Sequence, residues 1–460
     1  MIAKPADDVA TLEALKHYGA DALSFPALKT GACWWVDAPP PEGTGARLAY
    51  VPCGQSWVAV GTPLIEPAAR AKAVRHFMAA ARKHDRRPVF FGIEDREPFR
   101  DCRTLLLGMQ SVLKPSEWDA TLRRRPRLRE QLRRARVKGV TVRRVDVNEL
   151  ADGTPLRRAV ERLRREWLES RHLEPMSFLV AVEPFHAAPE HLYFVAERAG
   201  VAVQFLSAVP IYARHGWLME DMLRGREAPN GTTELVIDAL MRQLQTNPHW
   251  ITPGLTPLSG PIPWWMRLAR ATSVALYDFS GLRRFRERLQ PAAWRPIWLA
   301  WDRGPAAGPI VDVLRAFAGG QILPFALRSL LRHPNVLPWA LAVPLVPWTM
   351  LLAGLAAVGD RHLLGFSTAS LYGWAMFDAI LAWMLFRVAR RPRRSSLAAV
   401  AGLAGIDALI SVRHLATVGW GDGFVSASLR AVATTAPVVG TAALIWATWR
   451  AHLALTSHAS

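Results

Sequence analysis

The densest group of reactive side chains lies in a polar stretch from residue 220 to residue 234. Asp221 and Arg224 are three residues apart in this stretch, and Glu234 closes it. On a helical turn, Asp221 and Arg224 would share one face and could hold an ammonium group beside an ester or a phosphate. An ordinary salt bridge would have the same spacing, so the chemical and the structural interpretation both stay open.

A second candidate for chemistry is the cationic segment from residue 123 to residue 144, which holds eleven Arg or Lys residues opposed only by Glu130. Its apolar stripe consists of Leu122, Leu128 and Leu132. This pattern predicts a helix with one docked face and one cationic face. Such a surface favours phosphate groups, either of RNA or of an anionic membrane. The candidate substrate contacts in it are Arg127, Arg133 and Arg134.

Several common kinds of catalytic site are missing from the sequence. It contains no Walker A loop, no G-x-G-x-x-G, no H-E-x-x-H and no G-x-S-x-G. The 13 histidines are scattered, and the three cysteines show no C-x-x-C spacing. We therefore expect no metal site, no disulfide framework and no cofactor.

The elements that would position these residues are strands and helices that alternate in two mixed α/β units. Strand-like pieces occur at 32–36, 48–51, 57–60, 88–91, 192–197 and 201–209. Helical patterns occur at 68–84, 156–171 and 232–247. Pro229-Asn230-Gly231 is a turn signal, and Thr232 or Thr233 could cap the helix that follows. The expected division is 1–115 for the first unit, 116–145 for the basic connecting helix, 146–304 for the second unit, 305–335 for a linker and 336–452 for a membrane region.

The chain has 460 residues, of which 51% are hydrophobic, and a formal net charge of +19, which favours anionic partners. Four apolar segments are long enough to cross a bilayer as helices. They are 336–358, 363–386, 396–412 and 431–449. The arginine-rich loop from Arg387 to Arg394 predicts that the second span ends in the cytoplasm, because cytoplasmic loops retain Arg and Lys. We therefore expect a multi-pass protein of a bacterial-type cell membrane with a cytoplasmic head.

Two aspartates, Asp378 and Asp407, lie within the apolar spans. A charged carboxylate there is costly unless it is paired, hydrated or protonated. One interpretation is a polar site for a lipid headgroup or a proton. The other is a helix-to-helix contact, with Arg413 or His414 as the partner.

The polar stretch also resembles part of the C-terminal catalytic (DUF2156-like) domain of the phosphatidylglycerol lysyltransferase family, and the resemblance extends over residues 10–304. Asp221-x-x-Arg224 with Pro229-x-Gly231 is similar to the family's Asp-x-x-Arg and Pro-x-Gly signature. The other landmarks, in the family's order, are Arg123 to Gly139, Glu174 to Phe178, Gly254 to Ser259 and Phe285 through Pro296.

The resemblance implies an α+β fold of two tandem acetyltransferase-like (GNAT) units, followed here by an all-α transmembrane bundle. It implies transfer of an amino acid from aminoacyl-tRNA to phosphatidylglycerol, an anionic phospholipid. Asp221 would bind the donor's ammonium or orient the nucleophile, and Arg224 would steady the ester oxygen or the lipid phosphate. Further candidate substrate contacts are Glu234, Arg286 and Arg288.

Two alternatives stay open beside this expectation. One is a tandem GNAT transferase that acts on a peptide or another lipid. The other is a non-catalytic basic module that docks on an anionic membrane. The family's best-known members carry their membrane helices before the catalytic domain, whereas here the apolar spans follow it. This difference favours a tether for the head over a lipid transporter, and whether the spans move lipid stays open.

Overall fold

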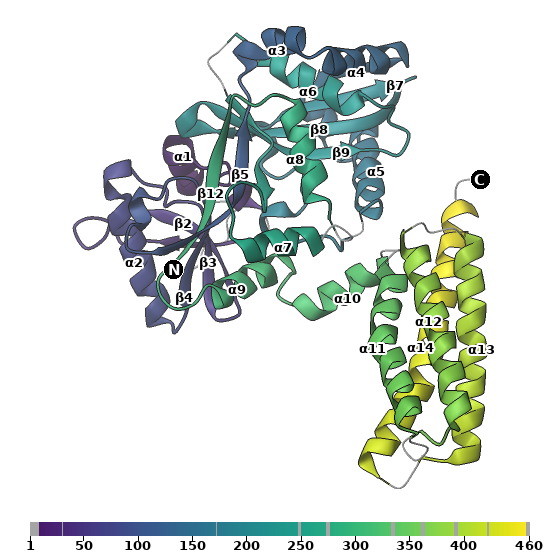
Figure 1. Cartoon of the computed structure of the whole chain (residues 1–460). Helices are drawn as coiled ribbons and strands as arrows, with labels where there is room; N and C mark the ends of the chain where they lie inside the picture. The colour runs from purple at the N-terminus through teal and green to yellow at the C-terminus, as the bar shows by residue number, and fades with distance from the viewer. Residues whose placement is uncertain are drawn as a thin grey trace. The chain divides into compact units, whose positions relative to one another are not determined.

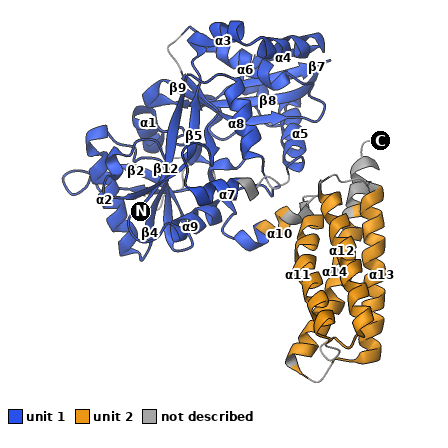
Figure 2. Cartoon of the chain, viewed as in Figure 1, with its two compact units in different colours: residues 1–325 blue, residues 326–460 orange. Residues whose placement is uncertain are grey.

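The computed structural model divides the chain into two compact units, residues 1–325 and residues 326–460 (Figure 2). It describes residues 9–29, 31–171, 173–246, 250–272, 277–332, 336–359, 364–390, 394–420 and 423–456. The three cysteines all lie in these ranges and are free thiols. The first unit holds two β-sheets with their helices, and the second unit is helical (Figure 1).

Seven strands form the first sheet, and helices cover both of its faces. These elements are α1 (Val9–Tyr18), β1 (Cys33–Val36), β2 (Arg47–Cys53), β3 (Ser56–Val60), α2 (Arg70–Lys83), β4 (Arg87–Ile93), β5 (Arg103–Val112), β11 (Leu255–Pro257), β12 (Ala293–Trp301) and α9 (Ala307–Phe317). The strand order is β1-β2-β3-β4-β12-β5-β11, and only β3 and β4 run parallel. Side chains alternate between the two faces, so Val58 packs in the core that includes α1 and α9, while Ala59 packs in the core that includes α2.

Five strands form the second sheet, in the order β10-β9-β8-β7-β6. Its elements are α3 (Trp118–Arg124), α4 (Pro126–Val137), β6 (Val140–Val145), α5 (Pro155–Glu169), β7 (Leu192–Arg198), β8 (Val201–Ile211), β9 (Gly216–Arg224), α6 (Thr232–Gln243) and β10 (Trp250–Thr252). Helices α3, α4 and α6 contribute to the core on one face, and α5 contributes to the core on the other. Each face therefore has its own hydrophobic core.

The two sheets do not follow the division expected from the sequence. Strands β11 and β12 belong to the expected second unit, yet β12 pairs with both β4 and β5, and β11 pairs with β5. Between them lie α7 (Trp264–Thr272) and α8 (Phe279–Arg288). The connecting segment 116–145 therefore does not divide the chain into one sheet before it and one sheet after it. Strands β11 and β12 follow the second sheet in the sequence but complete the first sheet.

The basic segment forms two helices and the start of the second sheet in place of the single connecting helix that we expected at 116–145, because Arg143 and Arg144 lie on strand β6. Helix α3 ends at Arg124, and α4 begins at Pro126. Proline has no N–H and disfavours helical geometry in the residue before it, and Arg125 accordingly has φ −122° and ψ 79°. The predicted apolar stripe is confirmed, since Leu122, Leu128 and Leu132 are buried.

The second unit consists mainly of four long helices, α11 (Val336–Val358), α12 (Thr368–Arg390), α13 (Arg394–Val418) and α14 (Phe424–Thr456). All four are long and apolar enough to cross a membrane, so the predicted spans are confirmed as helices. Residue 363 and part of the arginine-rich loop lie outside the described residues. Helix α10 (Ile322–Arg332) precedes the four. Helix α9 is not a further candidate span, because it packs on the first sheet. Its Asp312 is buried there and accepts a hydrogen bond from Ser56.

Arg286 fixes α8 against the loop between β10 and β11. Its side chain is buried, and its guanidinium donates to the carbonyls of Pro253 and Gly254 and to the hydroxyl of Thr256, at 2.5, 2.7 and 2.6 Å. Burial lowers the pKa of Arg286 to about 10. Two of its guanidinium nitrogens are thus engaged by the protein itself, which gives the residue a structural role.

Removing this guanidinium should therefore destabilise the head. Arg286→Ala leaves two buried carbonyls and a hydroxyl without their donor, and we expect a loss of about 2–3 kcal/mol in the free energy of unfolding. Arg288→Ala, two residues further on α8 and exposed, should change it by less than about 0.5 kcal/mol. Urea denaturation of both full-length variants in detergent, followed by tryptophan fluorescence, measures the difference. Equal midpoints would contradict the structural role.

Candidate active site

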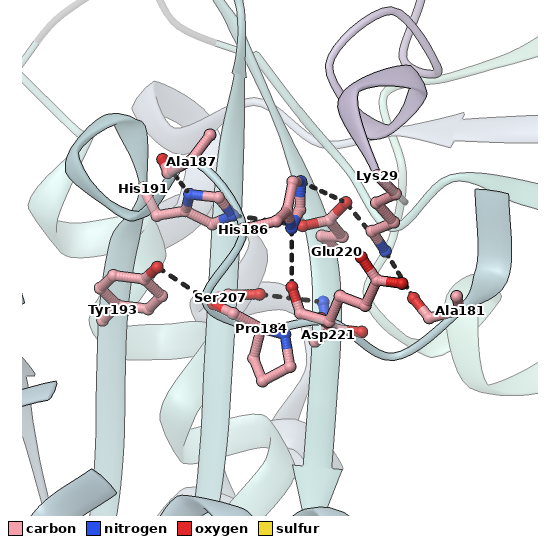
Figure 3. A network of polar contacts seen from close by, with 11 residues as sticks. Lys29, Ala181, Pro184, His186, Ala187, His191, Tyr193, Ser207, Glu220 and Asp221 are labelled. Carbon is pink, nitrogen blue, oxygen red and sulfur yellow. Dashed lines mark hydrogen bonds and ion pairs between the residues drawn. The ribbon is translucent and has the colours of Figure 1, made fainter. Parts of the chain in front are cut away.

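Asp221 lies on β9 at a β-bulge. In the pairing of β8 with β9, Ser207 is opposite Asp221 whereas Ala208 is opposite Met219, so Glu220 is the extra residue. A bulge interrupts the alternation of side chains along a strand. Neighbouring residues Glu220 and Asp221 consequently both contribute carboxylates to one buried group of polar side chains (Figure 3).

Glu220 is the centre of this buried group. Lys29, which precedes β1, lies with its Nζ 3.1 Å from Glu220 Oε1 and also donates to the carbonyl of Ala181 at 2.8 Å. His191 Nε2 is 3.3 Å from Glu220 Oε2, and His186 Nε2 is 3.8 Å from Glu220 Oε1 (Figure 3). These contacts lower the pKa of the Glu220 carboxyl against the opposing effect of its burial. Glu220 is therefore ionised.

The two imidazoles are oriented by backbone carbonyls. His186 Nδ1 lies 2.7 Å from the carbonyl of Glu183, and His191 Nδ1 lies 3.1 Å from that of Ala187. A carbonyl only accepts, so each Nδ1 carries a proton and donates it. Burial lowers the pKa of His186 and favours its neutral form, whose Nε2 is then a lone-pair acceptor. Among the described residues, His186 Nε2 has no hydrogen-bond partner.

This group of side chains is therefore rich in acceptors and poor in donors. Within this group, His186 Nε2 and Asp221 Oδ2 are buried atoms without a hydrogen-bond partner in the described structure, whereas Glu220 Oε1 is engaged by the ion pair with Lys29. A cationic group with several N–H donors, or a metal ion, would satisfy these two unpartnered atoms. His186, His191 and Glu220 present ligand atoms within 4.8 Å of one another. No motif in the sequence predicts this set, and the positive charge of Lys29 beside Glu220 favours an ammonium over a divalent ion.

Asp221 is the most strongly perturbed carboxyl of the group. Burial raises its pKa to about 7, with a further contribution from Glu220, while Lys29 acts in the opposite direction. Its backbone N–H donates to the hydroxyl of Ser207 at 3.2 Å, which holds the bulge in place. A carboxyl that titrates near neutral pH is suited to proton transfer.

Arg224 does not share a face with Asp221, so the expected helical turn is wrong. Both residues lie on β9, and the pairing is regular from Asp221 to Arg224, which places the two side chains on opposite faces of the sheet. Arg224 Nη2 donates to the carbonyl of Ala228 at 2.6 Å. The turn at residues 229–231 is confirmed, but Gly231 and not a threonine is the residue that precedes α6.

The remaining predicted residues are dispersed over the head. Glu234 is half-buried in the first turn of α6, and Arg127 is exposed on α4. Arg133 and Arg134 are exposed on α4 and both pair with Glu130 at 2.8 Å. Arg288 is exposed on α8, whereas Arg286 is the buried anchor described above. None of these side chains is part of the group around Glu220 in the described structure.

Three residues of that group, Lys29, His186 and His191, were not singled out in the sequence. Lys29 and Glu220 are far apart in the sequence, with most strands of the first sheet between them. No local sequence pattern could therefore predict their ion pair. His186 and His191 flank a short irregular segment before β7 and have the spacing of no common motif. Only the tertiary structure brings them to β9.

Comparisons with known proteins agree with the fold. A C-terminal DUF2156 domain from Agrobacterium fabrum, assigned to a lysylphosphatidylglycerol synthetase, aligns at 20% identity with a TM-score of 0.56, covering 68% of this chain and 98% of its own. L-PGS from Bacillus licheniformis aligns at 21% identity with a TM-score of 0.58, covering 69% and 97%. A tandem GNAT protein from the clavulanic acid biosynthesis pathway aligns over 65% of this chain and 97% of its own at 14% identity, with a TM-score of only 0.35. No curated protein matches.

The mixed α/β head and the helical region with four apolar spans that follows it, both expected from the sequence, are confirmed. The solved structures are too distant in sequence to establish more than the fold. The family described as phosphatidylglycerol lysyltransferase, C-terminal, matches residues 12–301, which is more than half of the chain. The chain therefore belongs to this family.

Proposed function

We propose that this protein transfers an amino acid from aminoacyl-tRNA to phosphatidylglycerol at the cytoplasmic face of a bacterial-type cell membrane. The family supports a lysylphosphatidylglycerol synthase-like activity. The observation that carries the proposal is the buried acceptor group of His186, Glu220 and Asp221 on and beside β9. Its acceptors suit the ammonium of an aminoacyl donor, and Asp221 suits a hydroxyl that has to lose a proton.

In the proposed reaction, the terminal hydroxyl oxygen of the lipid attacks the ester carbonyl carbon of the aminoacyl-tRNA. A new C–O ester bond forms, and the bond from that carbon to the ribose oxygen breaks. Asp221 takes the hydroxyl proton and returns it to the departing ribose oxygen. The donor is already an activated ester, so positioning and electrostatics are sufficient sources of acceleration, without a covalent intermediate or a cofactor. Arg224, on the opposite face of the sheet, is no longer a partner of Asp221 in this mechanism.

The cationic face of α3 and α4 supports tRNA as the donor. Arg123, Arg124 and Arg127 are exposed there. Arg133 and Arg134 are also exposed, but Glu130 offsets part of their charge. Opposite this face, Leu128 and Leu132 are buried against the second sheet, so the helix is fixed while its arginines face solvent. A rigid cationic surface of this kind binds a phosphate backbone independently of its sequence.

Helix α7 supports a phospholipid as the acceptor. It exposes Trp264, Trp265 and Leu268, at 69%, 38% and 57%. A neighbouring cavity of about 200 Å³ is lined by Arg270, Arg283 and Arg284 among others. Exposed aromatic and aliphatic side chains beside arginines are typical of a surface that lies on an anionic bilayer. The arginine-rich loop before α13 supports a cytoplasmic position of the head, because cytoplasmic loops retain Arg and Lys.

A transfer assay tests the proposal directly. Full-length protein in phosphatidylglycerol vesicles is mixed with tRNA charged with a radiolabelled amino acid, and the lipid is extracted. We expect label in the lipid fraction with lysyl-tRNA, and none with phosphatidylcholine vesicles or with free labelled lysine. Absence of label in lipid with every charged tRNA would overturn the transferase proposal. Label recovered in a peptide or another lipid would instead identify a different acceptor.

Asp221 should give the reaction a characteristic pH dependence. Its raised pKa means that the carboxyl stays protonated up to about pH 7 and becomes a base above it. We expect the single-turnover rate to rise from pH 6 to pH 8, and Asp221→Asn to lower it by about 10²–10⁴. The donor's own ammonium titrates at a pKa of about 8, so both proteins are assayed with the same donor. A variant that keeps the wild-type rate and profile would exclude Asp221 as the base.

The basic face should control tRNA affinity through salt. Replacing Arg124 and Arg127 by Ala should weaken binding and reduce the slope of log affinity against log salt by roughly 0.7–0.9 per arginine that contacts a phosphate. Filter binding of tRNA from 50 to 300 mM salt measures this slope. Arg75→Ala, an exposed arginine on α2, is the matched control and should leave it unchanged. An unchanged slope in the double variant would place the tRNA elsewhere.

A further inference from the structure

The four-helix unit encloses a cavity of about 370 Å³. It lies where two apolar clusters of the bundle meet, one containing Leu381 and Leu444 and the other containing Leu352 and Leu371. Side chains of both clusters line it, so it interrupts the core of the bundle. A volume of this size is in the range of small-molecule sites and well above the space that packing defects leave.

The two aspartates of the spans both line this cavity. On α12, Asp378 continues the buried stripe of Leu371, Ala375 and Leu381. On α13, Asp407 continues the stripe that includes Ala404. These are positions where the helical period calls for apolar side chains. The carboxylates therefore point into the bundle and not toward lipid.

The carboxyl of Asp378 forms no hydrogen bond or ion pair with any residue that the structure describes. Its side chain is 4% exposed. Asp407 is 6% exposed and accepts one hydrogen bond, from Ser411 at 3.3 Å. Of the two partners considered from the sequence, His414 is engaged with the carbonyl of Leu364 and is stacked on Phe366. Arg413 is exposed, and no ion pair joins it to either aspartate among the described residues.

Further acceptors and one cation face the same space. Pro344 on α11 and Pro437 on α14 line it, and neither can donate to the carbonyl four residues earlier. Those earlier residues, Ala340 and Ala433, also line the cavity. Arg430 adds a guanidinium, which donates to the carbonyl of Gly419 at 2.9 Å. The cavity thus combines two carboxylates with an apolar shell, and the guanidinium of Arg430 lies beside Gly419, twelve residues beyond Asp407.

We propose that this cavity is a binding site for a phospholipid whose headgroup carries a primary ammonium. The ammonium has three N–H donors, two of which match the carboxylates of Asp378 and Asp407. The apolar lining accommodates the start of the acyl chains. This inference does not depend on the transferase activity, because it concerns residues of the second unit alone.

A primary ammonium is favoured over other cations for a geometric reason. A quaternary ammonium carries charge but no N–H, so it cannot satisfy the orphan acceptors of Asp378. An anionic headgroup without an amine would add a negative charge next to two carboxylates. Phosphatidylethanolamine and an aminoacyl phosphatidylglycerol both provide the required chemistry, and experiment distinguishes them.

Native mass spectrometry of the full-length protein tests the site. In one arm, the protein in detergent is mixed with equal amounts of phosphatidylethanolamine and phosphatidylcholine of identical acyl chains. In a second arm, the pair is lysyl-phosphatidylglycerol and phosphatidylglycerol. We expect retention of one amine-bearing lipid over its partner by about tenfold or more in at least one arm. The arm with the larger ratio identifies the source of the ammonium. Equal retention in both arms would overturn the proposal.

Asp378→Asn removes the charge at constant size and should abolish the preference. Because no described residue forms a hydrogen bond or an ion pair with Asp378, the substitution removes none of the polar contacts that the structure describes. Circular dichroism verifies that the helices persist. Asp407→Asn is the second variant and should reduce the preference as well. Thr435→Val, an exposed residue of α14, is the control and should retain it. Wild-type preference in both aspartate variants would also overturn the proposal.

Discussion

The Lys29–Glu220 ion pair holds together the centre of the head. Lys29 comes from the segment between α1 and β1, and Glu220 lies on β9, so the pair joins the N-terminal part of the chain to the second sheet. Both side chains are almost fully buried, at 3% and 4% exposure. Loss of either partner would leave an uncompensated charge, at a cost of about 3–5 kcal/mol. The bulge that presents Glu220 to Lys29 also fixes the position of Asp221. The ion pair that joins the two parts of the head therefore also determines where the carboxyl of Asp221 lies.

A second constraint is the return of β12 to the first sheet. Because β12 lies between β4 and β5, the chain between β10 and β12 has to pass across the head, and it carries α7 and α8. Arg286 secures this passage by donating to the loop before β11. The surfaces that we associate with lipid are therefore parts of a connection anchored at both ends. An anchored surface of this kind keeps its exposed tryptophans in a fixed relation to β9.

The sequence was informative wherever the signal was local. Helical periods located α2, α5, α6 and all four long apolar helices, and the apolar stripe of α4 was buried as predicted. Strand pairing over long separations has no local signal, so the insertion of β12 could not be foreseen. The helical interpretation of Asp221 and Arg224 failed for a related reason. Strand β9 is covered on both faces, since Met222 packs against one core and Leu223 belongs to the other, so no alternation of polar and apolar residues marks it as a strand.

The carboxyl of Asp378, which has no hydrogen-bond or ion-pair partner among the described residues, indicates a role for the four helices beyond anchoring. A bundle that only tethers the head needs a packed apolar core, and an aspartate in the core stripe weakens it by the cost of burying an unsatisfied polar group. In the head, Asp221 has a comparable position, since it too is buried with an oxygen that has no partner. In each unit the unsatisfied carboxyl lies beside further acceptors, and in neither does a protein cation fully neutralise the group. Both are arrangements that an ammonium would complete, which argues that the membrane helices contribute a binding site of their own in addition to an anchor.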